Sequence, residues 1–182
     1  MDILSAIFML KIILAVALAG GLIFFFLSAC SIYTNLTTGV PWAKCPAENI
    51  HKIFKEINLS RNARLYDLGS GDGRTLFLAE KLGYRATGYE LSFYPYLKTR
   101  FRKFIGRSAV TVKRRNFFKE NLNQADAVFI FLVGKVMDRL GRKLAAELKK
   151  GTVVVSYGFV IPGWRIEKTI STKPSLTYVY RI

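Results

Sequence analysis

The stretch "YDLGSGDGR", residues 66–74, places three glycines at alternate positions directly after a short apolar run that ends in an acid. The run 64–68 is typical of a buried strand and residues 74–82 of a helix, so the glycines fall where the strand turns into the helix. In α/β sheets, ligands bind at this turn, beyond the carboxyl end of the first strand. Glycine permits positive φ there and lets a ligand approach the backbone. The stretch therefore predicts an α/β fold with a ligand-binding loop at 69–73.

The spacing of the glycines narrows the choice of ligand. A dinucleotide fingerprint needs a glycine where Arg74 stands, and a phosphate-binding P-loop needs a Gly-Lys-Ser/Thr sequence that is absent here. The loop therefore fits a nucleoside without a pyrophosphate. Glu90 ends the next predicted strand, where a carboxylate can accept hydrogen bonds from both ribose hydroxyls. Asp67, the glycine loop and Glu90 together indicate S-adenosylmethionine as the cofactor.

Strands and helices alternate along most of the remaining chain. We expect strands at 64–68, 84–91, 110–114, 127–133 and 152–157, helices at 46–57, 74–82, 95–105 and 136–148, and a final hairpin formed by 165–170 and 176–182. The central strands are apolar runs, as burial on both faces of a parallel sheet requires. This order predicts one α/β domain at 46–182, a Rossmann-like sheet flanked by helices.

The N-terminal region predicts a membrane anchor. Residues 12–30 carry no charge, and their length is close to the ~20 residues that cross a bilayer core. Lys11 stands at one end, where its ammonium can reach the headgroups. We therefore expect an N-terminal transmembrane helix within 1–35 that contacts the lipid bilayer through 12–30. A linker at 36–45 follows, and its mixed composition already begins at about Ser31.

Two other interpretations of this segment are a cleaved signal peptide and a lipoprotein. A signal peptide usually begins with basic residues, whereas this chain begins with Met1 and Asp2. The sequence 27–30 resembles a bacterial lipobox ending in Cys30. The segment 44–64 carries five cations, and the positive-inside rule then keeps the C-terminal side in the cytoplasm, which favours an uncleaved single-pass anchor.

The composition is strongly basic. Lys and Arg total 28 against 12 Asp and Glu, a formal net charge of +16. Such a charge implies an anionic partner, either nucleic acid, an acidic membrane face or an acidic substrate. Residues 98–119 contain nine cations and no acid. This stretch could bind RNA or anionic headgroups, or it could be a solvated basic face, and it lacks a recognisable RNA-binding module.

"YDLGSGDGR" with "GYEL" at 88–91 closely resembles class I S-adenosylmethionine-dependent methyltransferases. More narrowly, the chain resembles the membrane-anchored lysine methyltransferases of the ATP synthase c subunit and the adenine nucleotide translocase. That family has an N-terminal membrane segment, a proline/aromatic stretch comparable to Val40-Pro41-Trp42, and a late "P.W" matched by 162–164. The family usually continues the first stretch with another proline, where Ala43 and Lys44 stand here, so a substrate role of this segment does not carry over.

The resemblance implies a cofactor site built from three strand ends. Its residues would be Asp67, Gly69, Ser70, Gly71, Gly73, Glu90, Asn116 and Phe117. Asp67, Gly69 and Gly71 would line the methionine end and Glu90 would hold the ribose. Asn116 would meet the adenine or merely cap a loop, and Phe117 would flank the adenine ring or pack in the core.

The implied activity is methyl transfer to a protein lysine, and the implied partner is a protein in or at the membrane. Attack by a neutral amine needs positioning more than acid–base groups, and no metal site is expected. His51, the only histidine, is expected to be structural or solvated, and Asp126 to be structural. The end of the fourth strand, 133–135, would face the methyl group. The alternatives are an anchored RNA or small-molecule methyltransferase and a non-catalytic S-adenosylmethionine-binding assembly factor.

Overall fold

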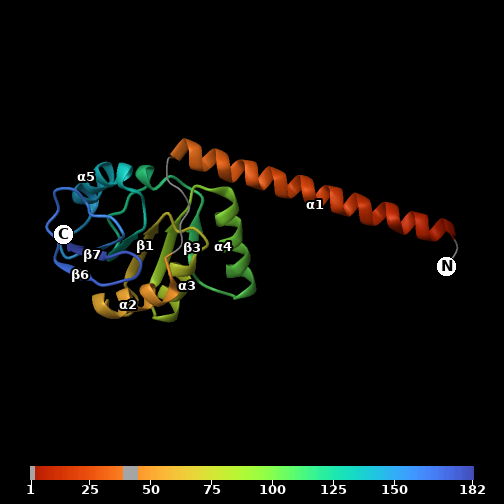
Figure 1. Cartoon of the computed structure of the whole chain (residues 1–182). Helices are drawn as coiled ribbons and strands as arrows, with labels where there is room; N and C mark the ends of the chain where they lie inside the picture. The colour runs from red at the N-terminus through yellow and green to blue at the C-terminus, as the bar shows by residue number, and fades with distance from the viewer. Residues whose placement is uncertain (1–2, 39–44) are drawn as a thin grey trace.

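The computed structural model describes residues 3–38 and 45–182. Its longest element is the helix α1 (Ile3–Thr38), which extends away from the rest of the molecule (Figure 1). Within it, Ile3–Cys30 is long and apolar enough to cross a membrane, by length and composition, and its apolar side chains are exposed. The linker predicted from about Ser31 is helical as far as Thr38, and residues 39–44, with Val40-Pro41-Trp42, lie outside the described residues.

The α/β prediction is confirmed by a seven-stranded sheet in the order β3-β2-β1-β4-β5-β7-β6. The strands are β1 (Arg64–Leu68), β2 (Arg85–Tyr89), β3 (Thr111–Lys113), β4 (Ala127–Ile130), β5 (Val153–Tyr157), β6 (Lys168–Ile170) and β7 (Thr177–Arg181). β1 to β5 pair in parallel, while β7 is antiparallel to both β5 and β6. The predicted C-terminal hairpin is therefore present, with its second strand inserted beside β5.

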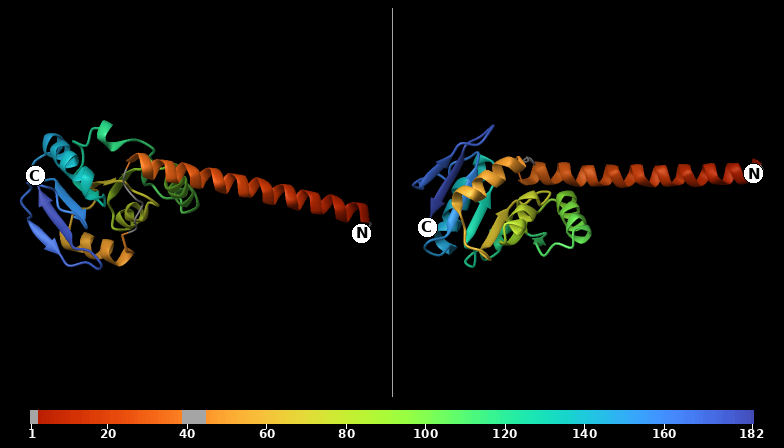
Figure 2. Two further views of the ribbon diagram at one scale, coloured as in Figure 1. Left: turned by 45° about the horizontal axis from the view of Figure 1, so that its top comes forward. Right: turned by 90° about the horizontal axis from the view of Figure 1, so that it is seen from below.

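Helices cover both faces of the sheet (Figure 2). The helices are α2 (Ala47–Ile57), α3 (Arg74–Lys81), α4 (Phe93–Ile105) and α5 (Met137–Glu147), with short 3-10 turns η1 (Phe117–Lys119) and η2 (Gly134–Val136). α2 and α3 bury residues such as Phe54 and Leu76 against one face. α5 buries Leu140 and Leu144 against the other. Burial on both faces explains why the central strands are continuous apolar runs.

Two strands end earlier than their sequences predict. β2 stops at Tyr89 and β4 at Ile130, although the apolar runs continue to Leu91 and Val133. After β2, the side chain of Glu90 turns to the backbone of the glycine loop. After β4, Phe131 borders a pocket. Hydrophobic pattern alone does not distinguish the last residue of a strand from the first residue of a site.

Close contact between β2 and the glycine loop depends on Gly88. A Cβ at this position would stand 2.6 Å from both Leu76 Cδ1 and Ser70 Oγ. Gly88 lies within β2, paired with Asp67 of β1. A methyl group there would force α3 and the loop away from the sheet.

We predict that Gly88→Ala lowers the free energy of unfolding by about 1–3 kcal/mol, the usual cost of overpacking. Thermal unfolding of the full chain in detergent measures the effect. Gly134→Ala is the matched control, because a Cβ there would meet its first neighbour, Phe159, at an ordinary 3.9 Å. Equal melting temperatures for Gly88→Ala and the control would contradict the packing argument.

Candidate active site

The glycine loop connects β1 to α3 in an unusual backbone conformation. Gly69, Gly71 and Gly73 have φ angles of 89°, 55° and 75°, so all three occupy the left-handed region that favours glycine. The N–H groups of Gly69 and Ser70 both donate to the Tyr89 carbonyl, at 2.9 and 3.1 Å. The alternating glycines are therefore explained by a loop that turns sharply while it stays bonded to β2.

Glu90 fastens this loop from the end of β2. Its Oε2 accepts the Gly71 N–H at 2.8 Å, and its Oε1 accepts the Ser92 N–H at 2.7 Å. The carboxylate is buried at 8% exposure, so these bonds are protected from water. Each oxygen keeps a further lone-pair direction, so the group can still accept two more donors, such as vicinal hydroxyls.

The helix α4 holds the same loop from the other side. Thr99 Oγ1 donates to the Gly71 carbonyl at 3.0 Å, and the Arg102 guanidinium donates to the Asp72 carbonyl at 2.9 Å. Thr99 is fully buried. The loop is thus bonded on both sides, and its peptide groups are set before any ligand arrives.

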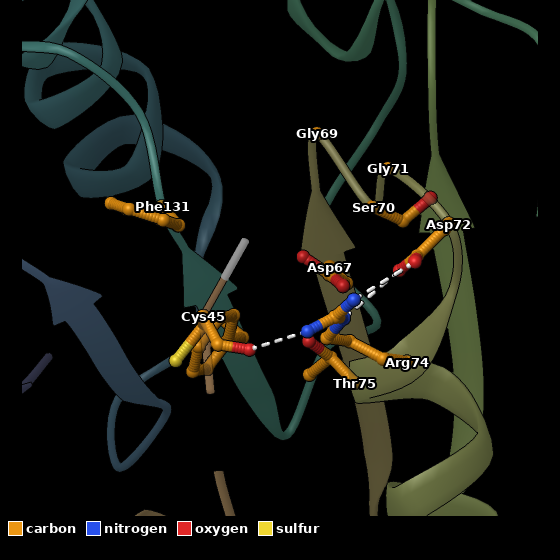
Figure 3. Close-up of a pocket in the computed structure, with 10 residues that line it drawn as sticks. Cys45, Asp67, Gly69, Ser70, Gly71, Asp72, Arg74, Thr75 and Phe131 are labelled. Atoms are coloured by element: carbon orange, nitrogen blue, oxygen red, sulfur yellow. Dashed lines mark hydrogen bonds and ion pairs between the residues drawn. The ribbon is translucent and has the colours of Figure 1, made fainter. Parts of the chain in front are cut away.

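A pocket opens beside the loop at the carboxyl ends of β1 and β4 (Figure 3). Its empty volume is about 320 Å³, including space open to solvent. The lining residues come from three segments of the chain, at 45, 67–75 and 129–131: Cys45, Asp67, Gly69, Ser70, Gly71, Asp72, Arg74, Thr75, Phe129 and Phe131. Glycine backbone and carboxylates form one side, whereas Phe131 lies across from them (Figure 3).

Arg74 joins two sides of the pocket. Its guanidinium makes two 3.0 Å bonds to the Asp72 carboxylate and donates to the Cys45 carbonyl at 3.2 Å. Burial acts to raise the pKa of Asp72, but the hydrogen bonds and charge of Arg74, with Lys98 and Arg102 nearby, hold it below its ordinary value. The segment before α2 is thereby held against the start of α3.

Asp67 has a different electrostatic environment from Asp72. Complete burial raises the pKa of Asp67 from 3.8 to about 8, against a hydrogen bond from Thr75 that favours ionisation. The neighbouring charges of Glu90 and Asp72 contribute to this increase. Burial, with the charge of Asp67, also raises the pKa of the Cys45 thiol to about 12, so this thiol is neutral at physiological pH.

The eight cofactor residues predicted from the sequence divide into two groups in the structure. Six lie in or beside the glycine loop or at the end of β2, and the other two lie beyond β3. Asp67, Gly69, Ser70 and Gly71 line the pocket, and Glu90 binds the loop that forms it. Gly73 begins α3 at its N-terminal end. Ser70 Oγ is buried and has no hydrogen-bond partner among the described residues, and it is directed at β2 (Figure 3).

Asn116 and Phe117 follow β3, further along the same edge of the sheet. Asn116 Oδ1 accepts the Phe118 N–H at 3.0 Å and so caps η1. Phe117 is half-buried against the core beneath α5 and contacts the Phe118 ring. Both positions lie beyond β3, whose last residue Lys113 bonds the Glu90 backbone. Their contact with an adenine stays a prediction.

Several pocket residues were not predicted as site residues from the sequence. Cys45, Asp72, Arg74, Thr75, Phe129 and Phe131 line the pocket without belonging to the predicted set. Asp72 and Arg74 flank Gly73, and their opposite charges two positions apart were an available signal. The contact of Arg74 with Cys45 spans 29 positions, so no local pattern could have shown it. His51 is exposed on α2, and residues 3–38 and 45–182 contain no cluster suited to a metal ion.

These residues fit a nucleoside with an aminoacyl tail. Glu90 offers a buried acceptor for two hydroxyls, and the glycine loop exposes peptide groups where side chains would block approach. A Cβ on Gly69 would lie 3.0 Å from Leu132 Cδ2, and the φ of 89° at this position also favours glycine. The pocket beyond the loop can accept the rest of such a ligand.

A solved structure of similar fold contains such a ligand. An RNA methyltransferase from Salinibacter ruber in complex with S-adenosyl-L-homocysteine superposes with a TM-score of 0.73 and 26% identity over 77% of this chain and 94% of that one. A ribosomal protein L11 methylase from Lactobacillus delbrueckii shares the fold at a TM-score of 0.64 and 12% identity, over 78% of this chain and 80% of that one. The family model for the ANTKMT methyltransferase domain matches residues 67–168, from the acid before the glycine loop to the start of β6.

The chain belongs to the ANTKMT methyltransferase domain family. Among its relatives, a protein-lysine N-methyltransferase of Saccharolobus islandicus is 32% identical over 74% of this chain and 86% of its own length. The adenine nucleotide translocase lysine N-methyltransferase of mouse and the ATP synthase c-subunit lysine N-methyltransferase of rat are each 31% identical, over 79% and 78% of this chain. This ANTKMT-family chain spans 63% and 64% of the mouse and rat proteins, less than two thirds of their length.

Family and fold together establish S-adenosylmethionine as the cofactor of this ANTKMT-family methyltransferase, as the sequence predicts. When bound, the cofactor supplies an electrophilic methyl group on a sulfonium. In this chain Asp67 and the glycine loop would hold its aminoacyl part, and Glu90 its ribose. The glycine loop and Glu90 are held in place by hydrogen bonds within the fold, so they can position a bound cofactor.

We predict that Glu90→Gln weakens S-adenosylmethionine binding about 10- to 100-fold, because hydrogen bonds to a charged group contribute about 1.5–3 kcal/mol. A glutamine can present only one carbonyl oxygen to the Gly71 and Ser92 N–H groups. Titration calorimetry on the full chain in detergent measures the affinity.

Glu80→Gln is the matched control for that variant. Glu80 accepts the Ala109 N–H and the Ser108 hydroxyl, so its substitution disrupts the same kind of bond away from the pocket. Its affinity for the cofactor should equal that of the wild type. An equal loss in both variants would show that Glu90 acts only through general stability.

We predict that Asp67→Asn stabilises the chain at pH 8.5 more than at pH 5, because the pKa of Asp67 is raised from 3.8 to about 8. Between these values the folded chain keeps a proton that the unfolded chain has lost, so its stability falls as the pH rises. Asparagine removes this dependence. Melting temperatures of both proteins, measured without cofactor across this pH range, test the sign.

Asp126→Asn should show the opposite behaviour. The side-chain hydrogen bonds of Arg64 lower the pKa of Asp126, so this carboxylate stabilises the fold above its unfolded pKa and loses that effect in acid. The variant is therefore expected to be less stable than the wild type at pH 7 and closer to it at low pH. The same pH response in both variants would refute the assignment for Asp67.

Proposed function

We propose that this chain is a membrane-anchored protein-lysine N-methyltransferase whose acceptor lysine belongs to a protein in or at the membrane. The proposal depends on two features that occur together in one chain, a methyltransferase domain and an apolar helix before it. The domain belongs to the ANTKMT family and contains a glycine loop beside a part-apolar pocket, and an exposed helix that is long and apolar enough to cross a membrane precedes it. Relatives named for methylating lysines of proteins support the choice of acceptor.

The pocket chemistry suits an amine acceptor. A lysine must lose its ammonium proton before its nitrogen can attack, and desolvation in an apolar site lowers the pKa of the ammonium. The rings of Phe129 and Phe131 and the neutral Cys45 thiol supply apolar surface opposite the glycine loop. Methyl transfer then depends on alignment of the amine with the methyl group, an effect worth about 7–11 kcal/mol in well-oriented reactions.

The anchor supports a membrane-associated acceptor. Confinement of enzyme and substrate to one bilayer raises their effective concentration without any new contact. The segment 44–64 after the apolar helix carries five cations, so by the positive-inside rule we place the domain on the cytoplasmic or equivalent inner side.

One observation favours a second function. The Salinibacter ruber structure is that of an RNA methyltransferase, and residues 98–119 carry nine cations without an acid. An anchored RNA methyltransferase is therefore the alternative that the decisive experiment must separate. A non-catalytic cofactor-binding assembly factor is the other alternative, and it would bind S-adenosylmethionine without turnover.

We predict that the full chain transfers tritium from labelled S-adenosylmethionine to a membrane protein in methylation-deficient membranes from the source organism. The label should require Glu90, resist RNase, disappear on protease treatment and appear as methyl-lysine after hydrolysis. Glu90→Ala is the inactive variant, and Glu80→Ala serves as its control because Glu80 bonds a loop outside the pocket.

Two other outcomes of this experiment would each support one of the alternative functions. Label that RNase removes would refute the lysine proposal and support RNA as the acceptor. Cofactor binding by calorimetry without labelling of protein, RNA or small molecules would support the assembly-factor alternative.

A further inference from the structure

The helix α4 carries its large apolar side chains on its outer face, unlike an ordinary surface helix. Its buried residues are Pro95 and Thr99. Five large apolar or aromatic side chains are exposed instead: Tyr94, Leu97, Phe101, Phe104 and Ile105. Phe104 is 82% exposed, and Phe101 and Ile105 are each 65% exposed. A soluble protein usually turns such residues inward, and a continuous exposed group of them marks an interaction surface.

These five residues form one stripe. Successive residues of an α-helix are about 100° apart, so Tyr94, Leu97, Phe101, Phe104 and Ile105 fall within an arc roughly 100° wide, opposite Pro95 and Thr99. Lys98 and Arg100 flank the stripe on its two sides, and Arg107 follows the helix end. The helix contains no acid. An apolar stripe bordered by cations is typical of a helix that lies in the interface of an anionic membrane.

The place of α4 in the molecule points to the same partner. α4 packs against α1 and runs across its direction, near the point where α1 reaches the domain (Figures 1 and 2). Its buried face is turned to the domain, so its exposed stripe is turned to the side from which α1 extends. If α1 crosses a bilayer, this stripe faces the bilayer surface.

We propose that the stripe of α4 is a membrane-docking surface that inserts its apolar side chains among the headgroups of an anionic bilayer. The inference rests on the anchoring of α1 in the proposed function. Lipid fits this surface better than RNA, because the bases of single strands stack on aromatic faces and Leu97 and Ile105 have none. The exposed guanidinium groups of Arg100 and Arg107 can pair with lipid phosphates.

Docking would fix the catalytic site relative to the bilayer. The inner face of α4 bonds the cofactor loop through Thr99 to Gly71 and Arg102 to Asp72, while its outer face would rest on lipid. One rigid helix would then stand between the membrane surface and the glycine loop. A lysine held at a set height above the bilayer would meet the methyl group. Docking of α4 would not favour methylation of a lysine on a freely diffusing protein.

The test uses the full chain in nanodiscs of equal parts phosphatidylcholine and phosphatidylglycerol, with nitroxide-labelled lipid as a quencher. A fluorescent amino acid replaces Phe101 in the stripe, Leu14 in the middle of the apolar helix, or Thr169, which is exposed on β6 at the edge of the sheet. We predict strong quenching at 14, clear quenching at 101 and none above background at 169. Pure phosphatidylcholine should reduce the quenching at 101 alone.

A matched pair of substitutions separates docking from general damage. Ile105→Glu places a charge in the stripe, and Ile166→Glu places the same charge on an exposed isoleucine outside it. Ile105→Glu should abolish quenching at 101 and lower methylation of a membrane-embedded acceptor at least several-fold, with cofactor affinity unchanged. Ile166→Glu should change none of these.

The outcomes distinguish failure of the inference from failure of the anchor. Quenching at 14 with only background quenching at 101 would overturn the docking surface and leave the anchor standing. Background quenching at both positions would overturn both. A probe at 101 that responds to a single-stranded RNA oligonucleotide in detergent and not to the lipid would assign the surface to RNA.

Discussion

The carboxylate of Glu90 is the contact on which the site depends. It joins the end of β2, the glycine loop and the start of α4 through the N–H groups of Gly71 and Ser92. The Gly71 N–H would otherwise be a buried donor without a partner, and such a group costs about 1–3 kcal/mol. One side chain thus satisfies two backbone donors, shapes the loop and keeps acceptor capacity for a ribose. A role in binding the ribose would use the same two oxygens as this structural role.

The pocket contains two carboxyl groups with opposite electrostatic surroundings. Arg74 keeps the pKa of Asp72 low, whereas burial raises that of Asp67 to about 8. The first group is part of a bridge between α3 and the segment before α2. The second faces apolar surface from β4 and lies where an aminoacyl ligand would bring its own positive charge. A ligand ammonium at this place would favour ionisation of Asp67, so cofactor binding and protonation of this acid should be linked.

The helix α4 connects the cofactor loop with the exterior of the protein. Small residues face inward, where Thr99 can approach the loop closely enough to bond Gly71. Large apolar residues therefore remain outside, in a helix that also carries an excess of cations. This inverted distribution leaves apolar surface in contact with water in a freely soluble domain, and a bilayer beside the anchor would bury it. The basic stretch 98–119 and the apolar helix at 12–30 would then contribute to one property, attachment at a defined orientation.

Local sequence was enough for the α/β class, the terminal hairpin, the glycine loop and the apolar N-terminal helix, because each depends on backbone preference or on periodicity. The motif around residues 66–74 with Glu90 was also sufficient for the cofactor, since both signals lie at predicted strand ends. Which side chains meet became visible only in the folded chain. Folding brings Cys45 to Arg74 and Phe131 to the glycine loop, and it turns Phe101 and Phe104 outward. These contacts depend on how the chain packs over long separations, and no short stretch of sequence contains that information.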